Sequence, residues 1–263
     1  AECAVIMGGW GVRGDGRGGR VETGPGPALT VGESSCNIKE KREERMKIKW
    51  YGHSAFLITT ESGTRIILDP YQSGAFGGAL AYGKIAEAAD IVLSSHDHDD
   101  HNYTGDIKGK FTLINTPGEH RGSGVAIQGI PTFHDPSGGK ERGLNIIYIV
   151  EADGMRIAHL GDLGHVLDDE AVKRMGRIDV LLAPVGGFYT IDPAEATKIV
   201  KDVKPAVTIP MHFKTGKCDF SIVPVADFTK GKSSVTEPGV AEIEVTPSNL
   251  ASLGEIVVLR HAL

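Results

Sequence analysis

Residues 96–101 read His96-Asp97-His98-Asp99-Asp100-His101 and place three imidazoles and three carboxylates in six consecutive positions. The apolar run Ile91-Val92-Leu93 precedes them and predicts a buried strand that leads into a loop. In an extended or tightly turned loop, His96 and His98 point to the same side and can converge on one cation. Asp100 and His101 then face a second cation. A solvated loop is the alternative, but the position after a buried strand favours a catalytic metal site.

This His-x-His-x-Asp-His pattern is the signature of the metallo-β-lactamase fold superfamily, which residues 46–263 resemble. The other motifs of the resemblance follow in order: Gly52-His53-Ser54-Ala55-Phe56, Leu68-Asp69-Pro70, Thr132-Phe133-His134-Asp135, Gly161-Asp162-Leu163-Gly164-His165 and Pro210-Met211-His212. The chain is similar to a branch of small metal-dependent hydrolases around ascorbate-6-phosphate lactonase. The resemblance implies an α/β fold, an αββα four-layer sandwich, with the site on loops along one edge.

Hydrophobic patterns predict the elements of such a sandwich. Short β-rich runs over residues 48–51, 56–59 and 65–69, with a turn at Glu61-Ser62-Gly63, predict an antiparallel meander. Further strands are predicted over 125–130, 144–150, 156–160, 180–183 and 206–210, and helices over 82–89, 168–175 and 192–203. Asp192 and Glu195 predict a capping box for the last helix, with Pro193 at its first position. Two packed sheets with outer helices fit this order, although the pattern alone allows other α/β arrangements.

The family pattern implies the ligands of two metal ions. His96, His98 and a third histidine hold the first ion, and Asp100, His101 and His212 hold the second. Asp162 follows a predicted strand and is expected to bridge both ions, since a carboxylate offers two oxygens. The third histidine is His134, which matches the motif, or His120 in the turn-like segment Pro117-Gly118-Glu119-His120; we prefer His134.

Other polar residues are expected around these ligands. Asp69 and Asp99 are candidates to accept an imidazole N–H and fix the tautomer of a ligand. Residues in motif-like stretches are expected to line the substrate pocket, namely His53, His165, Arg142, Asn145, Tyr189 and Asp135. For His53 the alternative is a hydrogen-bonded structural histidine. Arg142 and Lys214 are candidates to hold an anionic substrate group.

Five imidazoles with two carboxylates are typical of zinc, and manganese or iron also suits carboxylate-rich sites. Two such ions can generate a hydroxide nucleophile, with Asp100 and Asp162 as the acidic catalytic residues. The leading hypothesis is a cytoplasmic dinuclear hydrolase that cleaves a lactone, ester or amide bond in a small molecule. The alternatives are a phosphodiesterase or nuclease of the same fold and a metal-binding protein without turnover.

Composition separates the first 45 residues from the remainder. Residues 1–45 are Gly-rich, lack hydrophobic periodicity and hold seven basic and seven acidic residues, so the net charge of −6 falls on residues 46–263. We expect residues 1–45 to be a disordered extension, with Met46 as the natural start, and residues 46–263 to form the hydrolase domain. An acidic body disfavours nucleic acid as a partner.

No apolar stretch is long enough to span a bilayer, and no signal peptide is evident, so we expect no membrane association. Cys3, Cys36 and Cys218 leave one cysteine in the predicted domain, which fits a reducing compartment. Homo-oligomers are common in the branch, so the resemblance implies that this chain also forms a homo-oligomer.

Overall fold

Six strands form the first sheet, in the order β13 (Glu242–Val245), β1 (Met46–Gly52), β2 (Ala55–Thr59), β3 (Arg65–Leu68), β4 (Ile91–Leu93) and β5 (Thr112–Ile114). The structure, a computed structural model, describes Gly24 and residues 44–263. The predicted extension over residues 1–45, with Cys3 and Cys36, lies outside the described residues except at Gly24, Glu44 and Arg45. The meander β1–β2–β3 is antiparallel as predicted, and β3, β4 and β5 are parallel.

Eight strands form the second sheet, in the order β12 (Val235–Thr236), β14 (Ile256–Val257), β11 (Val207–Met211), β10 (Val180–Pro184), β9 (Met155–His159), β8 (Leu144–Ala152), β7 (Val125–Phe133) and β6 (Gly118–Gly122). The pairs β6/β7, β7/β8 and β8/β9 are antiparallel. The pairs β9/β10 and β10/β11 are parallel. Parallel strands end at the same edge, so the loops after β9 and β11 lie at one side of the sheet.

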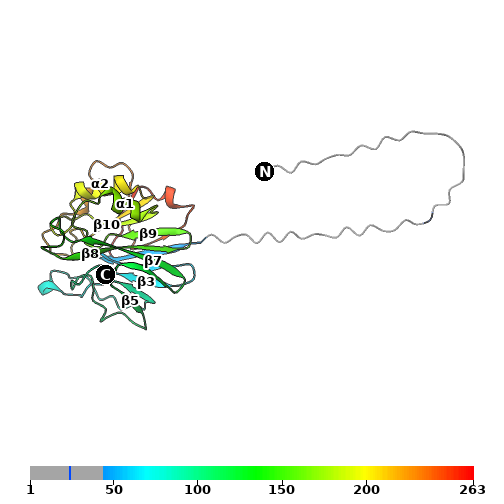
Figure 1. Cartoon of the computed structure of the whole chain (residues 1–263), viewed down its shortest axis with the longest axis horizontal. Helices are drawn as coiled ribbons and strands as arrows, with labels where there is room; N and C mark the ends of the chain where they lie inside the picture. The colour runs from blue at the N-terminus through cyan, green and yellow to red at the C-terminus, as the bar shows by residue number, and fades with distance from the viewer. Residues whose placement is uncertain (1–23, 25–43) are drawn as a thin grey trace. The chain divides into compact units, whose positions relative to one another are not determined.

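Three α-helices accompany these sheets within residues 44–263, namely α1 (Asp169–Met175), α2 (Pro193–Val203) and α3 (Val225–Thr229), with 3-10 turns η1 (Phe76–Gly78) and η2 (Leu250–Ser252). Helices α1 and α2 cover the second sheet beside β9 and β10, and β3 and β5 lie on the other side of that sheet (Figure 1). None of the described helices has the length and apolar character needed to cross a membrane. The predicted α/β sandwich is confirmed.

Apolar side chains alternate along the first sheet and cover both of its faces. Phe56 and Ile58 of β2 point into the large core between the sheets, whereas Ala55 and Leu57 point into a second cluster on the outer face. This alternation follows from the two-residue period of a strand. Tyr71, Leu80, Tyr82 and Ile85, from the segment after β3, complete the second cluster. The segment 70–89 is therefore the outer layer of this sheet.

The predicted helix over residues 82–89 is wrong, because that segment is irregular. Tyr82, Ile85 and Ala89 are buried, and their spacing imitates a helical face. The backbone is instead held by its neighbours: Ala81 N–H donates to Lys217 O, and Lys108 N–H donates to Glu87 O. Tertiary contacts thus override a local helical pattern that Gly83 already weakens.

The other predicted helices are confirmed, and several short strands were missed. Asp168 caps α1, and the predicted capping box of α2 is present. The predicted turn around residues 117–120 is wrong, since Gly118 begins β6 and His120 lies in that strand. Strands β5, β12, β13 and β14 and helix α3 were not predicted. They are two to five residues long, which leaves little room for a periodic signal.

The cap of α2 gives a first testable prediction. The Asp192 carboxylate accepts hydrogen bonds of 2.8 Å from the backbone N–H groups of Ala194 and Glu195. Asp192→Ala should lower the free energy of unfolding by about 1 kcal/mol, because these donors lose their acceptor. Chemical denaturation measures the change. Lys201→Ala, at an exposed position of the same helix, is the control and should change stability by less than about 0.5 kcal/mol.

Candidate metal centre

Loops that follow five strands bring histidines and carboxylates to one edge of the sandwich. His53 lies in the turn between β1 and β2, and residues 96–101 follow β4. His134 follows β7, Asp162 follows β9 and His212 follows β11. The His212 N–H donates to the His53 carbonyl at 3.1 Å, which ties the two sheets together at this edge. The predicted loop-borne site is therefore assembled from both sheets.

One group consists of His96, His98 and His134, which each offer a ligand atom within 4.8 Å of the others. The ring centroid of His96 lies 4.5 Å from that of His98 and 4.8 Å from that of His134. His120, the alternative to His134, lies in β6 with its Nε2 3.0 Å from the Thr116 carbonyl and belongs to no such group among the described residues. The structure therefore brings His134, and not His120, to the His-x-His pair.

A second group consists of His53, Asp100, His101 and His212, again with ligand atoms within 4.8 Å of one another. His53 was not predicted as a member of this group. Its Nε2 lies 3.0 Å from Asp100 Oδ2, so it pairs with the carboxylate. The ring centroids of His53 and His212 are 4.1 Å apart. His53 is thus the buried, hydrogen-bonded histidine that was the alternative to a pocket residue.

Asp162 lies between the two groups. Its Oδ2 is 3.2 Å from His101 Nε2 and 3.3 Å from the Nε2 atoms of both His134 and His212. The Asp162 N–H donates to Asn145 Oδ1 at 2.9 Å. Gly161 precedes it at φ +57°, where a Cβ would lie 2.3 Å from Asn145 Oδ1. Glycine is therefore required for Asn145 to approach and position the Asp162 backbone.

Asp69 orients two imidazoles from behind the site. It is fully buried and accepts hydrogen bonds from Ser95 N–H at 2.7 Å, Ser95 Oγ–H at 2.7 Å and His101 Nδ1–H at 2.8 Å. Because the Ser95 hydroxyl donates to Asp69, His96 Nδ1–H donates to Ser95 Oγ at 2.9 Å. Both His96 and His101 then direct a free Nε2 toward the centre, as ligand histidines do.

Several buried polar atoms at the site make no hydrogen bond, and they show whether a metal ion fits there. His96 Nε2, His101 Nε2 and Asp162 Oδ1 are buried and make no hydrogen bond within the described chain. Buried polar atoms are normally paired, and these three converge from the group His96, His101 and Asp162, whose ligand atoms lie within 4.8 Å of one another. Imidazole nitrogen and carboxylate oxygen are the donors that zinc and related divalent ions take. The residues therefore fit a bound cation.

Burial and neighbouring charges set the protonation of these groups. Burial, together with the nearby His212, lowers the pKa of His53 to about 4, and burial with His101 lowers the pKa of His96 to about 3. Burial opposes ionisation of Asp162, but His101 and His212 hold its pKa well below the usual value. The metal-free site therefore contains neutral His53 and His96 beside an ionised Asp162, which are donor states that bind cations. Burial opposes protonation of His101, but the carboxylates of Asp162 and Asp100 raise its pKa, so His101 gives up a proton when it binds an ion.

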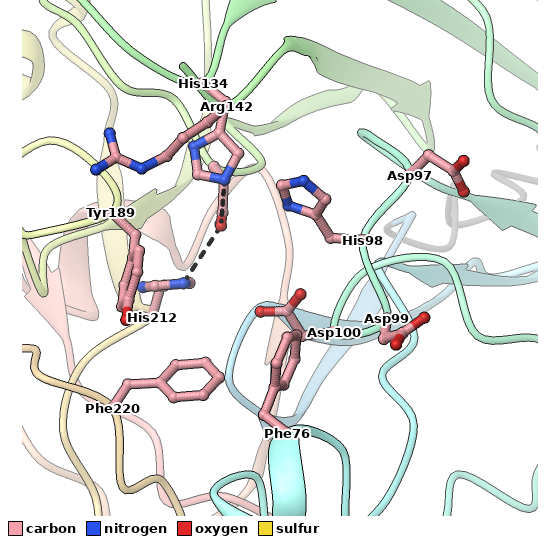
Figure 2. A pocket seen from close by; sticks show the side chains of 11 residues that line it. Phe76, Asp97, His98, Asp99, Asp100, His134, Arg142, Tyr189, His212 and Phe220 are labelled. Atoms are coloured by element: carbon pink, nitrogen blue, oxygen red, sulfur yellow. Dashed lines mark ion pairs between the residues drawn. The ribbon is translucent and has the colours of Figure 1, made fainter.

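A cleft of about 440 Å³ opens over these residues. His98, Asp100, His134, Asp162 and His212 form its floor, and Figure 2 shows Arg142 beside His134 with Tyr189 below it. The Arg142 guanidinium lies 5.9 Å from the Tyr189 ring centroid. Arg142 and Tyr189 thus lie where the sequence analysis placed them, along the cleft.

Four other predicted pocket residues do not line this cleft, and their expected roles are corrected. His53 and Asn145 are fully buried behind the floor. His165 Nε2 accepts from Phe133 N–H at 3.3 Å and is not among the residues that line the cleft. Asp135 is buried and its carboxylate accepts four backbone N–H groups, from Ser137, Gly139, Glu141 and Arg142. Asp135 therefore shapes the loop that carries Arg142.

Two further expectations are corrected by the contacts found. Asp99 is exposed at the cleft and makes no described bond to an imidazole, so Asp69 alone of the predicted pair orients a ligand. Lys214 Nζ donates to Asp219 Oδ1 at 2.8 Å and to the Phe220 carbonyl at 3.0 Å. Lys214 is not among the residues that line the cleft, so it does not lie where a substrate anion in the cleft would contact it.

Sequence reasoning missed three kinds of residue at the site. Ser95, which passes the Asp69 hydrogen bond to His96, directly precedes the histidine run, and that adjacency is a usable signal. His159 is fully buried; its Nε2–H donates to Ser54 O and its Nδ1 accepts from Gly161 N–H, next to Asp162. Phe76 and Phe220 line the cleft from irregular segments, where no periodicity marks them.

Comparisons with known proteins agree with this geometry. A family model described as Beta-lactamase superfamily domain matches residues 47–212. A UPF0173 metal-dependent hydrolase of Archaeoglobus fulgidus is 32% identical over 201 residues, which cover 65% of this chain and 84% of that protein. Its counterpart in Thermococcus kodakarensis is 35% identical over 199 residues, covering 65% of this chain and 85% of that protein.

Solved structures are similar over most of the described chain. The crystal structure of a candidate zinc-dependent hydrolase of the metallo-β-lactamase superfamily from Thermotoga maritima is 37% identical with a TM-score of 0.68, covering 81% of this chain and 98% of that chain. A metallo hydrolase of Ignicoccus hospitalis is 23% identical with a TM-score of 0.51, covering 65% of this chain and 83% of that chain, and shares the fold alone.

The contacts of Asp69 predict its effect on metal affinity. Asp69→Asn should weaken binding of zinc roughly 10–100-fold, since its NH2 group, a donor, replaces one of the two oxygens that accept from Ser95 and His101. Titration with zinc against a competing chelator measures the affinity, and circular dichroism checks the fold. Asp99→Asn, on the exposed side of the loop, should change affinity less than about threefold. Equal losses in the two variants would contradict the role given to Asp69.

The two candidate third histidines can be tested separately. His134→Ala should lower the number of zinc ions bound per chain, because one donor of the group His96, His98 and His134 is lost. His120→Ala should keep the wild-type number, since His120 belongs to no group of ligand atoms among the described residues and its Nε2 lies against the Thr116 carbonyl. Elemental analysis of both purified variants gives the stoichiometry. A loss confined to His120→Ala would reverse the assignment.

Proposed function

Since the chain belongs to the metallo-β-lactamase superfamily and is a metal-dependent hydrolase, we propose that it cleaves a lactone, ester or amide bond in a small molecule at two divalent metal ions. The observation that carries the proposal is the position of Asp162 between two groups of imidazoles at the floor of a cleft. Zinc is the proposed metal because imidazole donors predominate.

The residues proposed to hold the ions divide between the two groups. His96, His98 and His134 hold the first ion, and Asp100, His101 and His212 hold the second, with Asp162 shared. His53 is assigned to Asp100 because its Nε2 already lies 3.0 Å from that carboxylate. The buried Nε2 atoms of His96 and His101 and the Oδ1 atom of Asp162 make no hydrogen bond in the described chain, which supports bound ions at this point.

The chemistry divides between the bound ions and the chain. The ions supply Lewis acidity, which lowers the pKa of a water molecule toward neutrality and polarises the oxygen of the scissile bond. The chain orients the site, since Asp69 and Ser95 fix the rings of His96 and His101. Arg142 and Tyr189 line the approach and orient the substrate.

The cleft supports a small molecule over a nucleic acid. Its volume of about 440 Å³ lies in the range of small-ligand pockets. Asp97 and Asp99 are exposed along the lining, and their charges repel a phosphodiester backbone. We therefore favour a small substrate over the nuclease alternative, and the resemblance to the ascorbate-6-phosphate lactonase branch supports lactone and ester bonds as the first to assay.

Replacement of Asp162 tests the proposal. Asp162→Ala should abolish measurable turnover on a panel of lactones, esters and amides and release at least one metal ion per chain, because the shared carboxylate is lost. Rates and elemental analysis are measured on the same preparation. Asp227→Ala, in the first turn of α3, is the matched control and should keep both rate and metal content. Full metal content and rate in Asp162→Ala would refute the shared-ligand assignment.

A further inference from the structure

Two phenylalanines beside the cleft have a backbone conformation that bulky residues rarely adopt. Phe76 has φ +54° and Phe188 has φ +63°, and their side chains are 54% and 66% exposed. Left-handed conformations at such residues persist where the surrounding structure imposes them, and they cluster at functional sites. Neither ring is buried in the core, so core packing does not explain why they are held this way.

These rings belong to a continuous aromatic series. The ring centroids of Phe76 and Phe220 are 5.3 Å apart, those of Phe220 and Tyr189 are 5.8 Å apart, and those of Tyr189 and Phe188 are 4.7 Å apart. All three pairs are edge-to-face. We call Phe76, Tyr189 and Phe220 the aromatic wall; Figure 2 shows it next to Asp100 and His212, and Phe188 packs behind Tyr189. The wall offers a planar apolar group a matching surface.

Arg142 lies at the end of this wall nearest His134. It is the one lysine or arginine among the described residues that line the cleft, and its guanidinium lies over Tyr189. Its described ion pair is a 3.9 Å contact with exposed Glu141, which leaves most of its hydrogen-bonding capacity for another acceptor. The four N–H groups that Asp135 accepts hold the loop, so Arg142 is positioned before any ligand binds.

The charges around the cleft limit the anion that Arg142 can accept. Asp97, Asp99 and Asp100 line the cleft opposite Arg142 (Figure 2). One guanidinium matches one carboxylate in a bidentate pair. A phosphate monoester or a polyanion would bring further negative charge toward Asp97 and Asp99, which are not assigned to an ion. Since Asp100 is assigned to an ion, one guanidinium beside the exposed carboxylates of Asp97 and Asp99 favours a single carboxylate.

Resting on the proposed hydrolase function, we infer that the substrate is an aryl compound with one carboxylate. Its ring packs on the aromatic wall, its carboxylate pairs with Arg142, and its scissile carbonyl lies between them over Asp162. Water adds to that carbonyl, the bond to the leaving oxygen or nitrogen breaks, and the leaving atom takes up the proton. Arg142 and the wall determine specificity, and they take no part in this bond exchange.

Matched substrates measure separately the contact of the carboxylate with Arg142 and the contact of the aryl ring with the aromatic wall. The panel consists of a phenyl-bearing ester, lactone and amide, each as a carboxylate and as the isosteric carboxamide, with a second set in which methyl replaces phenyl. The zinc-loaded full chain should cleave the best phenyl substrate with a kcat/KM roughly 10–100-fold higher as the carboxylate than as the carboxamide, as a charge-assisted pair implies.

The variants assign these preferences to residues. Arg142→Gln should reduce the carboxylate-to-carboxamide ratio to about one, while Arg121→Gln, on β6, should keep the wild-type ratio. Phe76→Ala should lower the phenyl-to-methyl ratio roughly tenfold, and Val240→Ala, also an exposed apolar position, should not. Arg142→Lys should recover only part of the charge preference, because an ammonium lacks the bidentate fork.

The outcomes distinguish this inference from the function on which it rests. Cleavage of the panel without a carboxylate preference, or with a preference that survives Arg142→Gln, would overturn the inference and leave the hydrolase proposal standing. No cleavage of any member by the zinc-loaded chain would overturn both. A phosphorylated analogue that outperforms the carboxylate would also overturn the assignment of a single carboxylate.

Discussion

The buried carboxylate of Asp162 lies within 3.3 Å of three imidazole nitrogens, and the rest of the site depends on that arrangement. A carboxylate taken out of water needs compensating partners, and an imidazole cluster needs a negative charge at its centre. The three histidines come from loops after β4, β7 and β11, so the compensation requires both sheets to end at the same edge. The sandwich provides that edge, and Asn145 and Gly161 fix the carboxylate within it.

Further hydrogen bonds behind the imidazoles fix the orientation of the donor side chains. Asp69 reaches two of them, one directly and one through Ser95, while His53 holds Asp100. His53, Asp69 and His212 all have positive φ values, of 51°, 43° and 50°. The chain therefore accepts local backbone strain at three positions that orient or supply donor atoms. A stable core of two packed sheets compensates for this strain.

The site residues that could be predicted from sequence alone were those that lie close together along the chain. Residues 96–101 are adjacent in the chain, so their pattern identified most of a metal site before any folding was considered. Asp162, His134 and His212, which the structure brings close to those residues, were predicted because a family resemblance supplied the long-range relations that spacing cannot. The burial of a motif residue could not be predicted from the sequence. His53 and Asn145 lie in motifs, yet they are buried behind the cleft. Phe76 and Phe220 lie in irregular chain, and their meeting depends on tertiary packing alone.

The irregular segment 70–89 both seals the outer face of the first sheet and carries Phe76 to the cleft. A helix in that place would tie each side chain to its neighbours through a fixed repeat, whereas this segment is anchored at a few separate buried side chains. Insertions or deletions between those anchors can change what the cleft admits without moving a metal donor. Diversification of substrate choice among related chains is therefore expected to concentrate in this segment, while the donor loops stay constant.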